Sequence, residues 1–266
     1  MAIGARTHAD LIERLGFSSN STGGHMGRSM MLNEMDALVA ALSVTATKDD
    51  FVRAIIDENV LGKPTLSSRK ESLTRLNQIY GLDPATAVFR TLWRFGHLDP
   101  SSLPQLCLIC AYSRDPQLRH SFSFIRALKP GELLVRSLME EHLAQGFPNR
   151  FSSGMLASMA RNVNTTWSFG EHLTGKVKKV RTLPQPRPIT AAYAMFVGYL
   201  SGLRGEQLLG SVFADLIGAN RTQLLSALSL ASAQGVMSLK QAAGIVEFDF
   251  ANLLTSEEQT LIHESN

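Results

Sequence analysis

The side chains with the clearest chemical potential in this 266-residue sequence are basic ones gathered in one segment. Between Phe147 and Thr190 there are seven lysines or arginines but only one acidic residue, Glu171, which gives this segment a net charge of +6. The whole chain carries only +3, so the other residues together are mildly acidic. Because lysine and arginine neutralise phosphates, this asymmetry favours a polyanion such as nucleic acid as the partner.

The residue pattern around these charges predicts two helices joined by a turn and followed by a basic arm. Two serines can cap a helix over Gly154–Asn162, Asn162–Thr165 suits a turn, and a second helix follows over Trp167–Leu173. Basic and apolar residues then alternate over Lys176–Leu183 in a hairpin-like arm. This order is that of a winged helix-turn-helix, whose second helix enters the major groove of double-stranded DNA.

Short polar side chains near the start of the second predicted helix could meet base edges, and the basic arm could meet flanking phosphates. A weaker basic element over Lys63–Arg75 could bind a phosphate at a helix start. The alternative for both basic runs is a solvated helix or strand face, and Trp167 could serve helix packing instead of contacting sugar or base. The candidate nucleic-acid-binding residues are Arg69, Lys70, Arg150, Arg161, Asn162, Thr165, Thr166, Lys176, Lys178, Lys179 and Arg181.

Other patterns that could carry chemistry are incomplete. Cys107 and Cys110 form a CxxC inside an apolar stretch, but no second CxxC or HxxxH completes a zinc site, so we expect two core thiols and no metal. The loop Gly16–Gly27 matches no phosphate-binding motif and is interpreted as a linker. The histidines are scattered singly and no nucleophile motif is present, so we expect no enzyme, no catalytic residue and no cofactor.

Glycines and prolines bracket segments of helical periodicity along the chain, which predicts a mainly α, compact helical protein. For example, Gly81 ends one segment and the dipeptide Asp115-Pro116 begins another. The organisation that we expect is an N-terminal helical segment with a Gly/Ser-rich loop over residues 1–60, a helical core domain over 61–146, and a C-terminal helical domain with the winged element over 147–266.

Two strongly apolar segments follow the basic one, Ile189–Leu203 and Leu208–Ala233. Glycine, charged or polar residues interrupt both, so we expect core helices and no membrane span. With no secretory signal in view and two free cysteines, the expected location is cytoplasmic. The same segments could instead present an apolar surface to a partner protein.

One set of residues resembles a known family. These residues are Asn59, Leu61 and Lys63, then Ser67–Arg69, Tyr80–Leu82, Arg114–Asp115, Arg161–Asn162, Trp167, Gly170, Leu173 and Gly175–Arg181. Their spacing resembles that in the BrxA-type small proteins of bacterial BREX phage-exclusion systems. The resemblance covers about residues 60–181. It implies a mostly helical, non-enzymatic DNA-binding component of phage defence, acting beside a methyltransferase, an ATPase and a phosphatase-like subunit.

Two hypotheses follow from these observations. The first is a protein that binds double-stranded DNA through the basic winged element. The second is a protein–protein adaptor within the multi-subunit defence complex.

Overall fold

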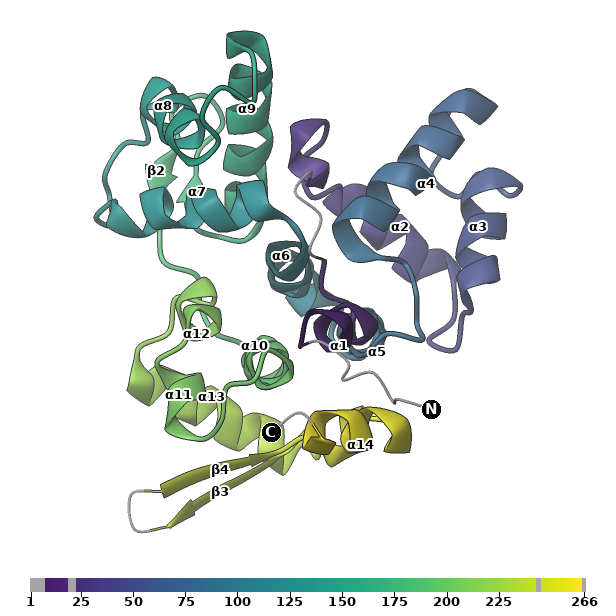
Figure 1. Ribbon diagram of the computed structural model, residues 1–266, viewed down its shortest axis with the longest axis vertical. Helices are drawn as coiled ribbons and strands as arrows, with labels where there is room; N and C mark the ends of the chain where they lie inside the picture. The colour runs from purple at the N-terminus through teal and green to yellow at the C-terminus, as the bar shows by residue number, and fades with distance from the viewer. Residues whose placement is uncertain (1–7, 19–22, 243–244, 265–266) are drawn as a thin grey trace, which may run out of the picture.

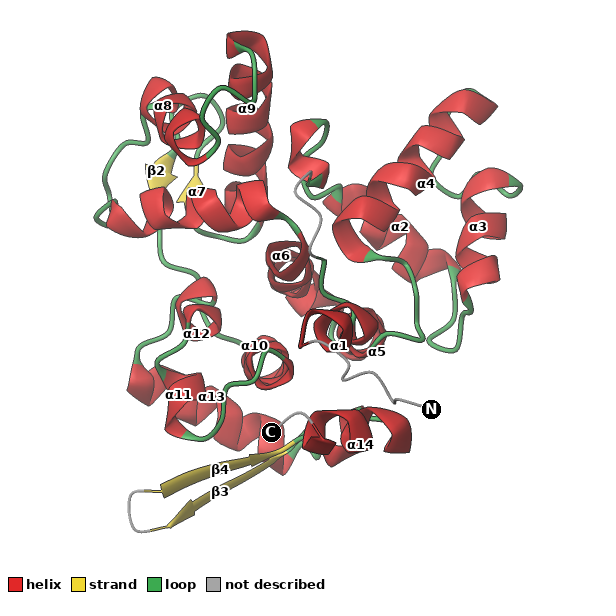
Figure 2. Cartoon of the chain, viewed as in Figure 1, coloured by secondary structure: helices red, strands yellow, loops and turns green. Residues whose placement is uncertain are grey.

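The computed structural model describes residues 8–18, 23–242 and 245–264. Within these ranges the chain is mainly α-helical, as predicted, with two small antiparallel hairpins (Figure 2). The α-helices are α1 (His8–Leu15), α2 (Leu32–Ala41), α3 (Lys48–Ile56), α4 (Leu66–Tyr80), α5 (Ala87–Leu98), α6 (Leu103–Arg114), α7 (Pro116–Ala127), α8 (Arg136–Gly146), α9 (Ser153–Phe169), α10 (Pro188–Leu200), α11 (Glu206–Leu209), α12 (Val212–Leu216), α13 (Arg221–Ala233) and α14 (Ser256–Glu264). The strands are β1 (Leu173–Thr174), β2 (Val180–Arg181), β3 (Ser238–Ala242) and β4 (Ile245–Asp249), and short 3-10 turns lie at Gly24–Met26, Pro100–Ser102 and Ala251–Leu253.

The elements form three groups around α5 and α6 (Figure 1). Helices α2, α3 and α4 lie on one side of α6. Helices α7, α8 and α9 with the β1–β2 hairpin lie on the other side, and we call this group the α9 lobe. Helices α10 to α13 with the β3–β4 hairpin occupy the bottom of the view, and we call them the C-terminal lobe.

Local signals start and stop many of the helices where the sequence predicts. The Asp115 side chain accepts from the backbone N–H of Leu118 and so caps α7, which then continues through Pro116 as its first residue. Gly81 ends α4 with a φ of 85°, a left-handed conformation that costs glycine little.

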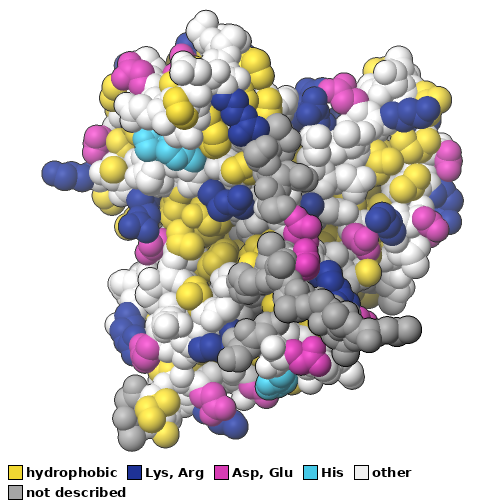
Figure 3. All heavy atoms as spheres, viewed as in Figure 1, with side chains coloured by type: hydrophobic (Ala, Val, Ile, Leu, Met, Phe, Trp, Pro, Cys, Tyr) yellow, Lys and Arg dark blue, Asp and Glu magenta, His cyan; other side chains and the backbone are white. Residues whose placement is uncertain are grey.

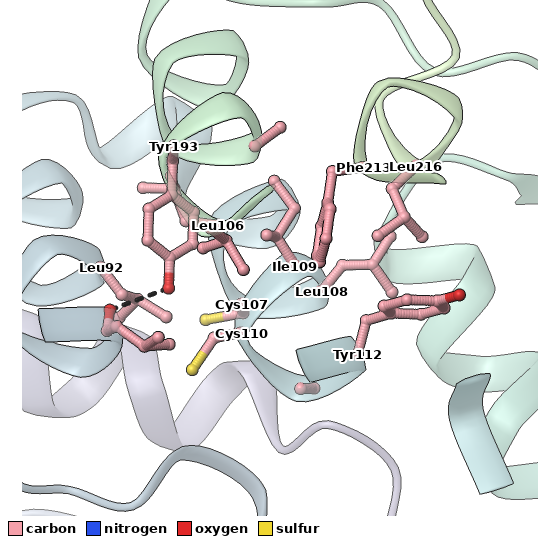
Figure 4. Packing of buried hydrophobic residues seen from close by; sticks show 14 of the residues in the cluster. Leu92, Leu106, Cys107, Leu108, Ile109, Cys110, Tyr112, Tyr193, Phe213 and Leu216 are labelled. Atoms are coloured by element: carbon pink, nitrogen blue, oxygen red, sulfur yellow. Dashed lines mark hydrogen bonds between the residues drawn. The ribbon is translucent and has the colours of Figure 1, made fainter. Parts of the chain in front are cut away.

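Helix α6 passes through the middle of the hydrophobic core, and every residue over Leu106–Tyr112 is buried (Figure 4). The thiols of Cys107 and Cys110 lie between α5 and α10, where the Tyr193 hydroxyl donates to the carbonyl of Val88 at 2.9 Å. Burial raises the pKa of Cys110 to about 11 and that of Cys107 further, so both remain neutral thiols. The CxxC is therefore a core element, as expected.

The predicted break within the basic segment is wrong. Helix α9 runs without interruption over Ser153–Phe169, through the predicted turn at Asn162–Thr165, and the Ser152 side chain caps it by accepting from the N–H of Met155. The winged helix-turn-helix is therefore not present with the predicted boundaries. The predicted domain boundary at 146/147 falls between α8 and α9, which pack against each other.

A hairpin does follow α9, and a third segment joins it. Strand β2 pairs with β1 on one side, with Leu173 opposite Arg181. On its other side Val180 forms an antiparallel bridge to Leu133, and the N–H of Leu134 donates to the carbonyl of Lys179 at 2.8 Å. The α9 lobe thus has the order helix α7, strand segment at Leu133, helices α8 and α9, and hairpin.

The C-terminal lobe repeats part of this order, since α10, α11 with α12, and α13 precede the β3–β4 hairpin. Helix α10 is its core element, because eleven of its thirteen residues are buried. In the part of the chain that the structure describes, no helix combines the length and apolarity that crossing a bilayer demands.

The continuity of α9 can be tested with proline. Thr165→Pro removes the N–H that bonds to the Arg161 carbonyl and creates a clash in the helix interior, so we expect a loss of about 3 kcal/mol or more in the free energy of unfolding. Ser153→Pro is the matched control, because Ser153 is the first helical residue, where proline is tolerated. Chemical denaturation of both variants measures the difference, and equal stabilities would contradict an unbroken helix.

Candidate nucleic-acid interface

Three of the seven basic residues in the charged segment are committed to contacts within the protein. Arg181 is 5% exposed, and its guanidinium donates to His172 Nδ1 at 3.1 Å. Arg187 pairs with Glu171 at 2.9 Å, and Lys179 Nζ donates to Ser168 Oγ at 2.6 Å. The expected phosphate contact by Arg181 is therefore wrong, because a buried guanidinium cannot reach a ligand on the surface.

The outward face of α9 carries a polar stripe. Arg161, Thr165 and Ser168 follow each other at spacings of four and three residues, which places them on one side of a helix, and we call them the α9 stripe. Arg161 is exposed, and Ser168 receives the hydrogen bond from Lys179 of the hairpin loop. This bond joins the end of the α9 stripe to the hairpin loop.

The tip of the β1–β2 hairpin is the most exposed part of this region. Lys176 and Lys178 are exposed, and Val177 between them is 96% exposed. Gly175 has a φ of 95°, and a Cβ there would lie 2.1 Å from the Lys178 carbonyl oxygen, so the tight turn requires glycine. Among the described residues, no carboxylate forms an ion pair with Arg161, Lys176 or Lys178.

Arg150 belongs to the loop that joins α8 to α9, and its guanidinium lies 5.5 Å from the centre of the Phe151 ring. It is exposed, as are Arg161 and the two tip lysines. The structure therefore leaves four of the predicted basic contact residues of this segment at the surface.

Two of the predicted base-contacting side chains point into the protein instead. The Thr166 Oγ1 atom is buried and hydrogen-bonds His25 Nε2 at 2.8 Å and the N–H of Met30 at 2.9 Å. Asn162 Nδ2 donates to the His25 carbonyl at 3.0 Å. Because these partners lie well over a hundred residues away in the chain, no local pattern indicates them. The buried Thr166 hydroxyl cannot meet a base edge, and the amide of the half-buried Asn162 is bound to the His25 carbonyl.

Trp167 is also buried, so its packing role is confirmed. Its indole N–H donates to Ser121 Oγ at 2.9 Å, and its ring stacks on Phe122 with 4.9 Å between ring centres. It thereby joins α9 to α7.

The contact that holds the inner face of α9 is a buried polar network. His25 Nδ1 lies 2.9 Å from Asp115 Oδ2, and neither side chain is exposed to solvent. The same carboxylate accepts from the N–H of His25 and caps α7, while the N–H of Gly23 donates to Gln117 Oε1 at 2.8 Å. Burial alone raises the pKa of Asp115, but the adjacent His25 and these hydrogen bonds together lower it below the ordinary value.

This network also corrects the interpretation of the Gly/Ser-rich loop as a plain linker. A Cβ on Gly23 would lie 2.2 Å from the Asp115 carboxyl group, and a Cβ on Gly24 would lie 2.4 Å from Ile79. The glycines therefore permit close packing from position 23 onward. Residues 19–22 of the predicted loop lie outside the described residues.

The Thr166 hydroxyl, the His25 imidazole and the Asp115 carboxylate are hydrogen-bonded in this order. The same order is found where a base activates a nucleophile and a carboxylate orients the base. The complete burial of these groups argues against such a role. All three residues have 0% of their surface exposed, and Thr166 Oγ1 already accepts from the N–H of Met30. A substrate has no path to this hydroxyl, so the network is structural.

The second basic element is separate from the first. Lys63, in the loop before α4, pairs with Glu34 of α2 at 2.8 Å, and Arg69 of α4 donates to the Ile56 carbonyl of α3 at 2.9 Å. Both side chains therefore make contacts within the protein. Lys70 is exposed on α4, which lies across the molecule from β2 (Figure 1). On the face shown in Figure 3, lysines and arginines alternate with acidic residues and form no single basic surface.

A buried histidine, His172, connects the β1–β2 hairpin to α12 by hydrogen bonds. His172 Nε2 donates to the Leu216 carbonyl at 2.8 Å, and its Nδ1 accepts from Arg181. Burial, and then the charge of Arg181, lower the pKa of His172 to about 3, so the ring is neutral in the folded protein.

No protein-family model matches this chain, and no curated protein matches it either.

The buried network predicts a large difference between two neighbouring threonines. Thr166→Val leaves His25 Nε2 and the N–H of Met30 without their buried partner, so we expect a loss of about 1–3 kcal/mol in the free energy of unfolding. Thr165→Val removes only a half-exposed bond to the Arg161 carbonyl and should cost about 0.5 kcal/mol or less. Urea denaturation of both variants checks this, and an equal loss in the two would contradict the assigned network.

His172 predicts a dependence of stability on pH. In the unfolded chain this histidine takes up a proton as the pH falls below about 6.5, whereas in the folded protein it does so only near pH 3. The unfolded state then binds more protons, so stability is lost as the pH falls from about 6.5 towards 3, by up to about 1.4 kcal/mol per pH unit.

The measurement is the free energy of unfolding of the wild-type protein and of His172→Gln, which keeps a donor for Leu216 but does not titrate. We expect the wild-type protein to lose more stability than the variant between about pH 7 and pH 5. Parallel losses in the two proteins would show that His172 does not contribute.

Proposed function

We propose that this protein binds double-stranded DNA through the α9 stripe and the tip of the β1–β2 hairpin. The observation that carries the proposal is the Lys179–Ser168 hydrogen bond, because it joins an exposed helix face to an exposed basic hairpin. Arg161, Lys176 and Lys178 lie on this surface without carboxylate partners among the described residues. Unpaired cations on one face are what a phosphate backbone attracts.

The dimensions of the surface suit a duplex. An α-helix with its side chains is about 10–12 Å across, and a major groove about 12 Å wide admits it. Arg161 and Ser168 are separated by about 10 Å along the axis of α9, at 1.5 Å per residue. In this arrangement α9 would lie in the groove, and the lysines of the hairpin tip would neutralise phosphates beside it. The small side chain of Thr165 would face the bases.

The placement of this activity in phage defence rests on the resemblance to BrxA-type proteins. That resemblance includes Arg161 and Gly175–Arg181, which belong to the proposed surface. Under this proposal the protein is a non-enzymatic DNA-binding component that works beside a methyltransferase, an ATPase and a phosphatase-like subunit.

The adaptor hypothesis loses part of its basis. It relied on apolar surface from Ile189–Leu203 and Leu208–Ala233, but most of the first segment is α10, which is buried, and Leu224, Ala227, Leu228 and Ala231 of the second are buried in α13. The remaining exposed apolar side chains of the C-terminal lobe, Leu230 at 55% and Ile245 at 71%, lie on different elements, α13 and β4. DNA binding therefore has the stronger support.

The proposal predicts the salt dependence of binding. Each phosphate contact contributes about 0.9 to the slope of log K against log salt concentration. Lys176→Gln/Lys178→Gln should reduce the magnitude of that slope by about 1.8 and weaken binding about tenfold or more in dilute salt. Fluorescence anisotropy of a labelled duplex over a salt series measures both quantities.

Lys129→Glu provides the matched control. It changes the net charge by the same two units, it lies in the α9 lobe, and it is exposed. Two residues after Lys129, the N–H of Gly131 donates to the carbonyl of Arg181 at 2.8 Å, so Lys129 lies near the base of the hairpin and not at its tip. We expect this variant to retain nearly all affinity. Equal weakening by the two variants would show that net charge and not the hairpin tip determines binding.

A further inference from the structure

A hollow between the α9 lobe and the C-terminal lobe contains two arginines that the proposed DNA surface does not use. It measures about 390 Å³, within the usual range for small-molecule sites. Tyr112 at the end of α6 contributes to its wall, together with one face of α7 and Val212 of α12. Figure 3 shows apolar side chains in the recess between these lobes, with lysine or arginine side chains at its border.

The charge of Arg119 in this hollow is only partly compensated. Its guanidinium is half-buried and donates to the Tyr112 carbonyl at 3.2 Å. Burial lowers the pKa of Arg119, while the charge of Asp115 acts in the opposite direction, but that carboxylate is already occupied by His25 and the start of α7. Within the described residues no acidic side chain forms an ion pair with Arg119. A guanidinium has five N–H donors, so several remain available.

A second guanidinium and a hydroxyl are directed to the same space. Arg126, about two helical turns beyond Arg119 on α7, donates one bond to Asp215 at 2.7 Å and is exposed at the rim. The Tyr112 hydroxyl points away from the buried cysteine cluster, as Figure 4 shows. Burial raises the pKa of Tyr112, so its hydroxyl remains protonated and able to donate.

The rest of the lining is apolar. Phe122, Ala127 and Val212 form its floor and side. The Ser123 hydroxyl, which also faces the hollow, already donates to the His120 carbonyl at 2.9 Å. Positively charged hydrogen-bond donors lie at one end of the hollow, and its floor is apolar. This combination suits a ligand that has an anionic head and a planar or apolar body.

We propose that this hollow binds a phosphate monoester of about the size of a mononucleotide. Arg119 and Arg126 would hold the phosphate, with the Tyr112 hydroxyl as a further donor, because guanidinium groups match phosphate oxygens in geometry and charge. The base or another apolar body would cover Phe122 and Val212. Because the hollow lies between two lobes and away from the α9 stripe, this site is independent of DNA binding.

Isothermal titration calorimetry on the full chain tests the proposal with three probes, adenosine 5′-monophosphate, inorganic phosphate and adenosine. We expect saturable binding of the nucleotide at one site, with adenosine and inorganic phosphate each at least about tenfold weaker, because each lacks one part of the ligand. No binding of the nucleotide, or equal affinity for adenosine, would overturn the proposal.

Variants assign the site. Arg119→Gln should weaken the nucleotide about tenfold or more through the loss of a charged hydrogen bond. Arg126→Gln should also weaken binding of the nucleotide. Because Arg126 is exposed at the rim of the hollow, we do not expect this variant to unfold. The matched control is Arg136→Gln on α8, an exposed arginine paired with Glu140 in the same lobe. Unchanged affinity in a folded Arg119→Gln or Arg126→Gln protein, or equal weakening by Arg136→Gln, would refute the assignment.

Discussion

The buried bond between His25 and Asp115 is the contact on which the arrangement of the α9 lobe depends. One carboxylate caps α7, receives the N–H of His25 and binds its imidazole, and the other ring nitrogen reaches Thr166 of α9. The two contacts of the imidazole span 90 and 141 residues of chain. Since each buried polar atom is costly without its partner, the three segments must be in place together.

This constraint determines which face of α9 meets solvent. The inner face is fixed because Asn162 and Thr166 bind His25 and because Trp167 stacks within the core. The opposite face then carries Arg161 outward, and through Ser168 it joins the hairpin. The face of α9 on which the DNA-binding proposal rests is thus exposed because a buried polar network orients the opposite face of the helix.

The sequence predicts the helical class and the helix ends that depend on local residues, such as Asp115-Pro116 at the start of α7. It fails within α9, because Asn162 and Thr165 are weak helix formers that look like a turn, and the partners of Asn162 and Thr166 come from far along the chain. A charge count also treats all basic residues alike. It therefore could not separate the exposed Lys176 from the buried Arg181.

The most direct measurement of the central claim is amide hydrogen exchange of the whole chain with and without a short DNA duplex. If α9 and the hairpin bind DNA, the duplex should slow exchange at the hairpin tip, residues 175–179, and in α9, while α4 and the β3–β4 hairpin stay unchanged. Slower exchange confined to α4 or the β3–β4 hairpin, or no change anywhere at saturating DNA, would contradict the account.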